Sequence, residues 1–186
     1  MAVNVWRGLG PVLILGSGGH ATVLQEAFRG RGIHAAMVNH HTEAFDICGD
    51  QYLTLGMGRR SIRRQVADAF PKGPWASVVH YSAAVSPSAQ IGEGAQIMAG
   101  AIVQANAIIG KHAIINTGAQ VDHGCKIGDF AHICPGAVLC ADVTVWDGAM
   151  VEPGQVVRRG CMVGHPFCVP YIPPDAEPGG ITWVDK

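Results

Sequence analysis

The sequence has little net charge, no long apolar run and no closely spaced pair of cysteines. Its formal net charge is −1 over 186 residues, so it offers no basic surface for nucleic acid or for an anionic membrane. No stretch is apolar enough to span a bilayer, and residues 1–10 lack the apolar core of a signal peptide. The six cysteines include no CxxC pair, which indicates reduced thiols. We therefore expect a cytoplasmic protein with no membrane insertion and no nucleic-acid partner.

From residue 79 onward the sequence lacks both the helical period of 3.6 and the strand period of two. Instead, every sixth residue from Val79 to Val169 is aliphatic, sixteen positions in all. A small residue, most often alanine, stands two positions before most of them. Residues i and i−2 of a strand point to the same side, so both kinds of residue would face inward. The period predicts a parallel β-helix of hexapeptides around one continuous core.

Glycines indicate how many hexapeptides make one coil of this β-helix. Gly92, Gly110 and Gly128 recur eighteen residues apart, which predicts three hexapeptides per coil and a triangular prism. The repeat region would then form about five coils. The hand of the coil does not follow from this pattern.

The first 77 residues carry a different pattern. An apolar run over residues 11–15 leads into a glycine turn, a helical apolar stripe and a second apolar run that ends before Asn39. The turn residues are Gly16, Ser17, Gly18, Gly19 and His20. This order predicts a nucleotide-binding βαβ unit, and with it an α/β Rossmann-like N-terminal domain. Its glycines would bring N–H groups to a phosphate or sugar. A merely tight turn is the alternative, because the motif is not a full GxGxxG.

A second helix is expected before the repeats begin. Ile62, Val66 and Phe70 are apolar residues four apart, and Pro71 stops the pattern. The expected helix and the residue before it carry Arg59, Arg60, Arg63 and Arg64. These arginines could attract a pyrophosphate, but a solvated helix face is the expected role.

Two histidines of the repeat region stand out. In the six-residue frame His123 lies at a corner, two residues past Val121, and His132 directly precedes the inward Ile133. Both should therefore point out of the prism. They are either surface histidines or a general base, because an imidazole with a pKa near 6.5 accepts a proton at neutral pH.

Three stretches resemble one known family. IINTGAQVDHGCKIGDFAHICPGAVL, GSGGH and VVHYSAAVSPSAQIGEGAQIMAGAIV are similar to segments of the bacterial sialic-acid O-acetyltransferase and UDP-4-amino-sugar N-acetyltransferase family. The resemblance covers roughly residues 11–170. It implies a left-handed β-helix over residues 78–170, a Rossmann-like acceptor domain over residues 1–77 and a C-terminal tail over residues 171–186. It also implies a homotrimer, acetyl-CoA as donor, and a nucleotide-linked amino sugar or sialic acid as acceptor.

The same resemblance implies roles for single residues. His123 would be the catalytic base, and Asp122 a carboxylate that orients it. The cofactor-binding residues would be Asn116, His132 and Ala141, the last in place of a usual glycine. The acceptor-binding residues would be Gly16, Ser17, Gly18, Gly19, His20 and Asn39.

The chain departs from the family's pattern in two more places. Gly124 follows His123, where the family often has an acidic residue, so Asp122 alone would supply that charge. After Asp142 the pattern degrades, because Trp146 replaces a glycine and about one coil is lost. The missing residues belong to the region that normally holds coenzyme A.

Metal and thiol chemistry are the rival uses of these residues. β-Helical carbonic anhydrases, which the prism also resembles, pair two histidines five apart. Here His112, His123 and His132 are spaced eleven and nine apart, so no metal is expected. Cys125 and Cys161 occupy the small inward slot and should be inert packing. Cys134 and Cys140 follow inward residues, and neither has an obvious base.

The sequence thus predicts an acetyl-CoA-dependent N-acetyltransferase with direct transfer and His123 as general base. Its acceptor would be a nucleotide-linked amino sugar. A sialic-acid O-acetyltransferase is the first alternative. A non-catalytic trimeric scaffold that binds a sugar nucleotide is the second.

Overall fold

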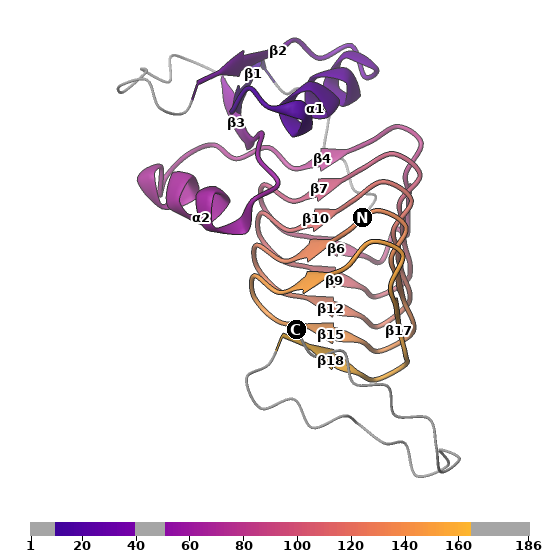
Figure 1. Ribbon diagram of the computed structural model, residues 1–186. Helices are drawn as coiled ribbons and strands as arrows, with labels where there is room; N and C mark the ends of the chain where they lie inside the picture. Colours follow the sequence, from indigo (N-terminus) through magenta and orange to yellow (C-terminus); the bar gives the residue numbers. More distant parts are fainter. Residues whose placement is uncertain (1–9, 40–50, 165–186) are drawn as a thin grey trace, which may run out of the picture.

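The structure, a computed structural model, describes residues 10–39 and 51–164. Most of the described chain is a parallel β-helix whose coils stack into a three-sided prism (Figure 1). Its fifteen strands are two residues long and lie in three parallel sheets of five. Each strand pairs with the strand eighteen residues away, as Ile115 does with Ile133. The predicted triangular prism of about five coils is confirmed, and the predicted left-handed β-helix fits it.

We name the three faces of the prism by their first strands. The β4 face contains β4 (Val78–Val79), β7 (Gln96–Ile97), β10 (Ile114–Ile115), β13 (His132–Ile133) and β16 (Met150–Val151). The β5 face contains β5 (Ala84–Val85), β8 (Ile102–Val103), β11 (Gln120–Val121), β14 (Val138–Leu139) and β17 (Val156–Val157). The β6 face contains β6 (Gln90–Ile91), β9 (Ile108–Ile109), β12 (Lys126–Ile127), β15 (Thr144–Val145) and β18 (Met162–Val163).

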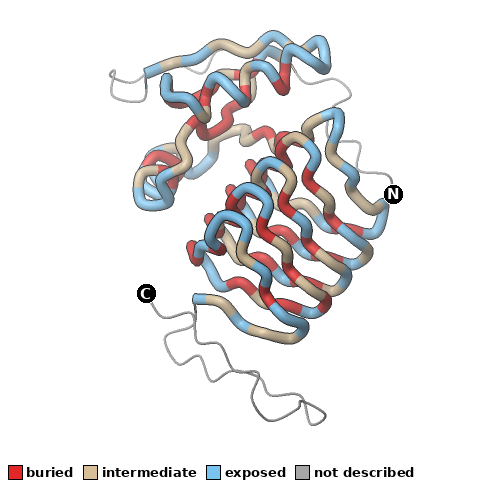
Figure 2. Tube along the Cα trace, turned by 45° about the vertical axis from the view of Figure 1, so that its right-hand side comes forward, coloured by how far each residue is buried: buried red, intermediate tan, exposed pale blue. Residues whose placement is uncertain are grey.

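The core of the prism consists of the residues that the period of six places inward. The second residue of each strand and, for most strands, the small residue two positions before it form one hydrophobic cluster along the whole axis. Figure 2 shows the buried positions recurring from coil to coil. Between strands the chain turns through a residue with positive φ, usually glycine, because an L side chain there costs about 1–2 kcal/mol. Four other residues take this turn conformation: Asn106, His112, Phe130 and Asp142.

The N-terminal segment forms a small layer on top of the β4 face (Figure 1). Its elements are β1 (Val12–Leu15), α1 (Gly19–Arg29), β2 (Ala35–Val38), β3 (Tyr52–Leu55) and α2 (Arg60–Ala69). The three strands make a parallel sheet in the order β2-β1-β3.

The predicted Rossmann-like domain is wrong. That fold is a doubly wound sheet with helices on both faces, whereas the described residues of this layer form three strands and two helices. Such a small layer cannot enclose its own core, and the β-helix completes it instead. Leu24 and Phe28 of α1 belong to one hydrophobic cluster with Val78 and Ile114, two outward residues of the β4 face.

Helix α2 packs against the corner between the β6 and β4 faces, which we call the helix corner. Arg63 is fully buried there and donates hydrogen bonds to the carbonyl oxygens of Gly58 (2.5 Å) and Phe130 (2.6 Å). Arg60 bonds the Gly148 carbonyl, and the Arg64 guanidinium lies 4.8 Å from the centre of the Phe130 ring. The expected solvated helix face is therefore wrong for Arg63.

Two remaining expectations concern the ends and the surroundings of the chain. No helix within residues 10–39 and 51–164 is long and apolar enough to cross a membrane. The expected tail, residues 171–186, and the last step of the period, Val169, lie outside the described residues. The division into domains at residue 77 stays a prediction.

Candidate functional site

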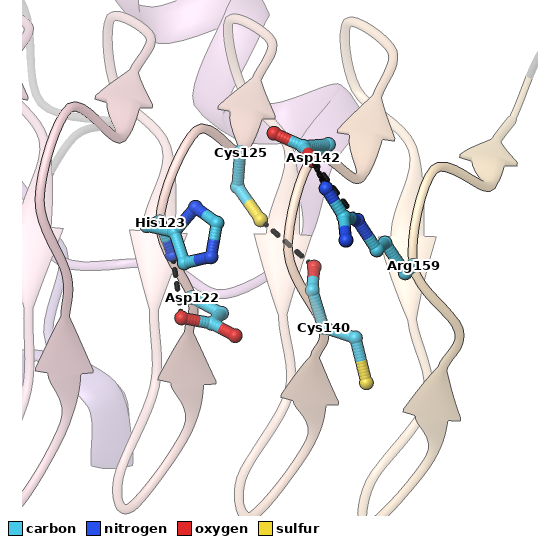
Figure 3. A network of polar contacts seen from close by, with 6 residues as sticks. All are labelled: Asp122, His123, Cys125, Cys140, Asp142 and Arg159. Atoms are coloured by element: carbon cyan, nitrogen blue, oxygen red, sulfur yellow. Dashed lines mark hydrogen bonds and ion pairs between the residues drawn. The ribbon is translucent and has the colours of Figure 1, made fainter.

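His123 lies at the corner between the β5 and β6 faces, which we call the His123 corner (Figure 3). Its side chain is exposed, as its place in the six-residue frame predicts. The carboxylate of Asp122 does not bond the imidazole. Oδ1 of Asp122 instead accepts the backbone N–H of His123 at 2.7 Å, which fixes the turn. The ring nitrogens of His123 have no hydrogen-bond partner among the described residues, so they are available to a ligand.

Ala141 stands one coil below His123 at the same corner. It is buried, and its carbonyl accepts the N–H of Gly160 at 3.0 Å. Its own N–H has no partner within the described part of the chain, whereas Asp122 occupies the N–H of His123. A backbone donor thus lies next to an exposed imidazole, and such a donor can stabilise an oxyanion.

The nearest thiol is not suited to chemistry. Cys125 is buried, and its Sγ donates to the carbonyl oxygen of Cys140 at 3.2 Å (Figure 3). Burial raises the pKa of the Cys125 thiol to about 11, with smaller contributions from the carboxylates of Asp122 and Asp142. A thiol with this pKa is protonated at neutral pH, so Cys125 serves as packing.

A second polar cluster joins the N-terminal layer to the outer surface of the β4 face. Nε2 of His20, in α1, lies 2.7 Å from Oε1 of Gln96, in β7. Nδ2 of Asn116 lies 3.0 Å from Nε2 of His132, in β13. Gln96 is buried, and its Nε2 donates to the Leu55 carbonyl at 2.7 Å. The first turn of α1 is thus bonded to β7, and the turn after β10 is bonded to β13, with β10 between these two strands on the face.

The amide partners determine the tautomers of both histidines. An amide nitrogen only donates, so Nε2 of His132 accepts from Asn116 and its Nδ1 carries the proton. An amide oxygen only accepts, so Nε2 of His20 donates to Gln96 and its Nδ1 keeps a lone pair. Burial and the nearby Arg63 and His20 lower the pKa of His132 to about 4. Burial chiefly, with Arg63, also lowers the pKa of His20, although its bond to Gln96 opposes the shift. Both rings are neutral at pH 7.

In the glycine turn, among the described residues, only His20 makes a side-chain hydrogen bond, and the acceptor-binding role of the turn stays a prediction. Gly16 is buried with φ 129°, and a Cβ there would approach the Gly56 carbonyl oxygen to 3.1 Å. Glycine is therefore required at position 16, because β1 packs closely against Gly56, the residue that follows β3. Ser17, Gly18 and Gly19 are exposed at the start of α1, and Asn39 is exposed after β2.

Within one chain, His123 lies apart from the group that contains Asn116 and His132. His123 lies at one edge of the β5 face, and Asn116 lies at the other edge, in the turn that joins the β4 and β5 faces. The sequence analysis missed Gln96 altogether and did not predict that Arg63 is buried. Gln96 stands at an outward position of the β4 face, eighteen residues before Ile114 and thirty-six before His132. This spacing was the signal that could have identified it. No group of three or more metal-binding side chains exists among the residues described.

Comparisons with known proteins show which family the chain belongs to. Residues 88–123 match the family model described as bacterial transferase hexapeptide (six repeats). The chain is 30% identical to PerB from Caulobacter crescentus in complex with CoA and GDP-perosamine, with a TM-score of 0.69. That alignment covers 83% of this chain and 92% of the other. This chain belongs to the hexapeptide-repeat transferases.

A second neighbour of this hexapeptide-repeat transferase is the acetyltransferase domain of PglB from Neisseria gonorrhoeae in complex with acetyl coenzyme A. It is 28% identical, with a TM-score of 0.68, and the alignment covers 88% of this chain and all of the other. A point mutant of the Caulobacter crescentus perosamine N-acetyltransferase is 30% identical over 84% of this chain and 90% of the other, with a TM-score of 0.65. No curated protein matches the chain. The family and these neighbours make the chain an acyltransferase.

Proposed function

We propose that this acyltransferase is a homotrimeric, acetyl-CoA-dependent N-acetyltransferase of a nucleotide-linked amino sugar. The neighbours that bind CoA with GDP-perosamine, or acetyl coenzyme A, support the donor and the class of acceptor. The observation that carries the proposal is that the chain has an exposed His123 without a hydrogen-bond partner among the described residues and, apart from it, two neutral histidines, His20 and His132. His123 offers a base, and the other two offer positioned hydrogen-bond donors and acceptors.

The chemistry assigns a task to each group. Acetyl-CoA would supply the acetyl group as a thioester. His123 accepts the proton that the acceptor amine loses, because its ring nitrogens are exposed and histidine is the side chain that most often acts as a general base. The free N–H of Ala141 offers a hydrogen bond to a developing oxyanion. His132 presents Nδ1–H as a donor and His20 presents Nδ1 as an acceptor, and both rings are neutral at pH 7.

A site shared between copies of the chain would join the two clusters. The outward residues of the β5 face are largely apolar: Ala84, Ile102, Gln120, Val138 and Val156. Val156 is 62% exposed in the single chain. A neighbouring copy packed against this face would bury that surface. It would also bring its own Asn116 and His132 to the edge of the face where His123 lies.

Release of free thiol from acetyl-CoA tests the activity. We expect turnover with a GDP- or UDP-linked 4-amino sugar and no turnover without an acceptor. Turnover with sialic acid alone would instead show a hydroxyl acceptor. Binding of the sugar nucleotide without any thiol release, over a panel of GDP-, UDP-, dTDP- and CMP-linked amino sugars, would show a non-catalytic scaffold.

Mixed oligomers test the shared site. His123→Ala and His132→Ala should each be nearly inactive when expressed alone. If a site combines His123 of one copy with His132 of the next, random mixing leaves about a quarter of the sites intact. Co-expression of the two variants should therefore restore about a quarter of wild-type activity. No recovery in a mixed trimer, confirmed by mass spectrometry, would contradict the shared site.

A further inference from the structure

Asp142 occupies a turn position where most coils have glycine. Its φ is 61°, a conformation that costs a non-glycine residue about 1–2 kcal/mol and that Asp and Asn tolerate better than others. Its backbone N–H donates to the His123 carbonyl at 3.0 Å. Asp142 therefore lies directly below the turn that carries His123, one coil further along the prism.

The Asp142 carboxylate is directed toward that turn. A Cβ on Gly124 would overlap Oδ1 of Asp142, so the glycine after His123 is what makes room for the carboxylate. Gly124 and Asp142 are a matched pair of positions, eighteen residues apart. Any larger residue at position 124 would displace Oδ1 from this place, and a glycine at position 142 would leave the space empty.

Arg159, on the following coil, holds the carboxylate still. Its Nη2 and Nε donate to Oδ2 of Asp142 at 2.9 and 3.1 Å (Figure 3). Both bonds go to Oδ2, and Oδ1 accepts no hydrogen bond within the described residues. Both side chains are largely exposed, so the ion pair itself adds little stability. Its effect is to fix the direction in which Oδ1 points.

We propose that Asp142 is the carboxylate that positions the His123 imidazole and stabilises its protonated form. His123 stacks above Ala141, whose side chain ends at Cβ, so the imidazole has room to turn toward Oδ1 of Asp142. Asp122 is committed to the backbone N–H of His123 and acts on the turn. When His123 takes the proton of the acceptor amine, the resulting imidazolium faces a fixed negative charge one coil away. Asp142 thus acts through His123 as a positioning residue.

Other charged groups near the His123 corner also act on the imidazole. Asp122 and Lys126 lie on the coil of His123, and Arg159 lies two coils below it. The coil above presents Ala105, whose carbonyl accepts the Gly124 N–H, and the uncharged Asn106. Arg159 opposes the effect of Asp142 on His123, but Oδ1 of Asp142 lies between Arg159 and the turn.

The inference rests on the proposed role of His123, and its test is chosen to stand apart from that role. Asp142→Asn keeps the shape and tolerates the positive φ, so the fold should survive. The ¹⁵N NMR chemical shifts of the His123 imidazole, recorded on the oligomer, should change in Asp142→Asn, because the ring loses its charged partner. The kcat should fall roughly tenfold, with KM nearly unchanged.

Asp122→Asn is the comparison, because it removes the other carboxylate of the corner. We expect it to lower the melting temperature more than Asp142→Asn does and to change the ¹⁵N chemical shifts of the His123 ring less. An equal or larger change of these chemical shifts in Asp122→Asn would overturn the assignment of Asp142. If His123→Ala remains fully active, the proposed function fails. The NMR comparison would still decide whether Asp142 is the partner of the imidazole.

Discussion

Two corners of the prism have the same backbone and opposite surroundings. At the helix corner the positive-φ positions include His112 and Phe130; the arginines of α2 contact Phe130, and Trp75 contacts His112. At the His123 corner the same position holds Gly124 and Asp142, and no described element of the N-terminal layer packs on it. A repeat that makes every corner alike in its core can therefore assign one corner to packing and another to chemistry. Only the outward residues differ.

The helix corner shows how a strained position serves stability. The ring of His112 stacks on Phe130 at 5.0 Å between centroids and meets the edge of Trp75 at 4.8 Å. Burial lowers the pKa of His112 to about 4, with Glu93 and Asp129 opposing the shift. The Phe130 ring lies between Arg64 of α2 and the His112 ring, and the His112 ring contacts both Phe130 and Trp75. That packing offsets the cost of the positive φ.

The largest effect is expected at the His123 corner, where one substitution should greatly lower activity without changing the fold. His123→Ala should lower kcat by about 10²–10⁴-fold, the usual contribution of a general base. The melting temperature and the oligomeric state should be unchanged, because the side chain touches no core residue. Steady-state kinetics beside calorimetry checks both. Turnover within twofold of wild type would remove His123 from the mechanism.

The next largest effect is expected at the helix corner, on stability. Arg63→Met should lower the free energy of unfolding by about 3 kcal/mol, because it removes the side-chain donor of the buried Phe130 carbonyl oxygen and of the half-buried Gly58 carbonyl oxygen. The melting temperature should fall by roughly 6–12 °C.

Its neighbour Arg64 provides the matched control. Arg64→Gln loses only an exposed contact with the Phe130 ring, worth about 0.5–1 kcal/mol. Similar losses in both variants would contradict the view that Arg63 holds α2 on the prism.

An effect of intermediate size is expected in the dependence of stability on pH. His112 and His132 have folded pKa values of about 4, below their unfolded value near 6.5. Between these two pKa values the unfolded chain binds more protons than the folded chain. The contribution of the two neutral histidines to the free energy of unfolding is therefore complete above pH 6.5 and is lost as the pH falls through about 4. Each should contribute up to about 2–3 kcal/mol. Urea unfolding from pH 7 to pH 4 measures the loss, and His112→Gln should flatten the profile.

The smallest effect is expected at Cys125. Cys125→Ala should leave both activity and melting temperature nearly unchanged, because alanine fills the equivalent inward slot at Ala107 and Ala89. A loss of activity at constant melting temperature would point to thiol chemistry at the His123 corner. Thiol titration of the wild type should find Cys125 unreactive in the folded state.

Several features of the molecule follow from local rules. The period of six placed the inward residues in register, because a two-residue strand sends each side chain to a defined side. The outward direction of His123 and His132 followed from the same frame and is confirmed. The Rossmann-like domain did not follow correctly. A short strand, turn and helix cannot show how many further strands join a sheet or which surface completes its core.

The sequence by itself therefore determined the prism, its core and the direction of its outward residues, because each depends on spacing within one or two coils. Tertiary structure decided the rest. Arg63 is buried only because α2 packs on coils nearly seventy residues away. Gln96 joins His20 across seventy-six positions. Asp142 reaches the turn of His123 because stacking places position 142 beside position 124. In each case the partners lie in different coils or layers, and only the packed chain brings them together.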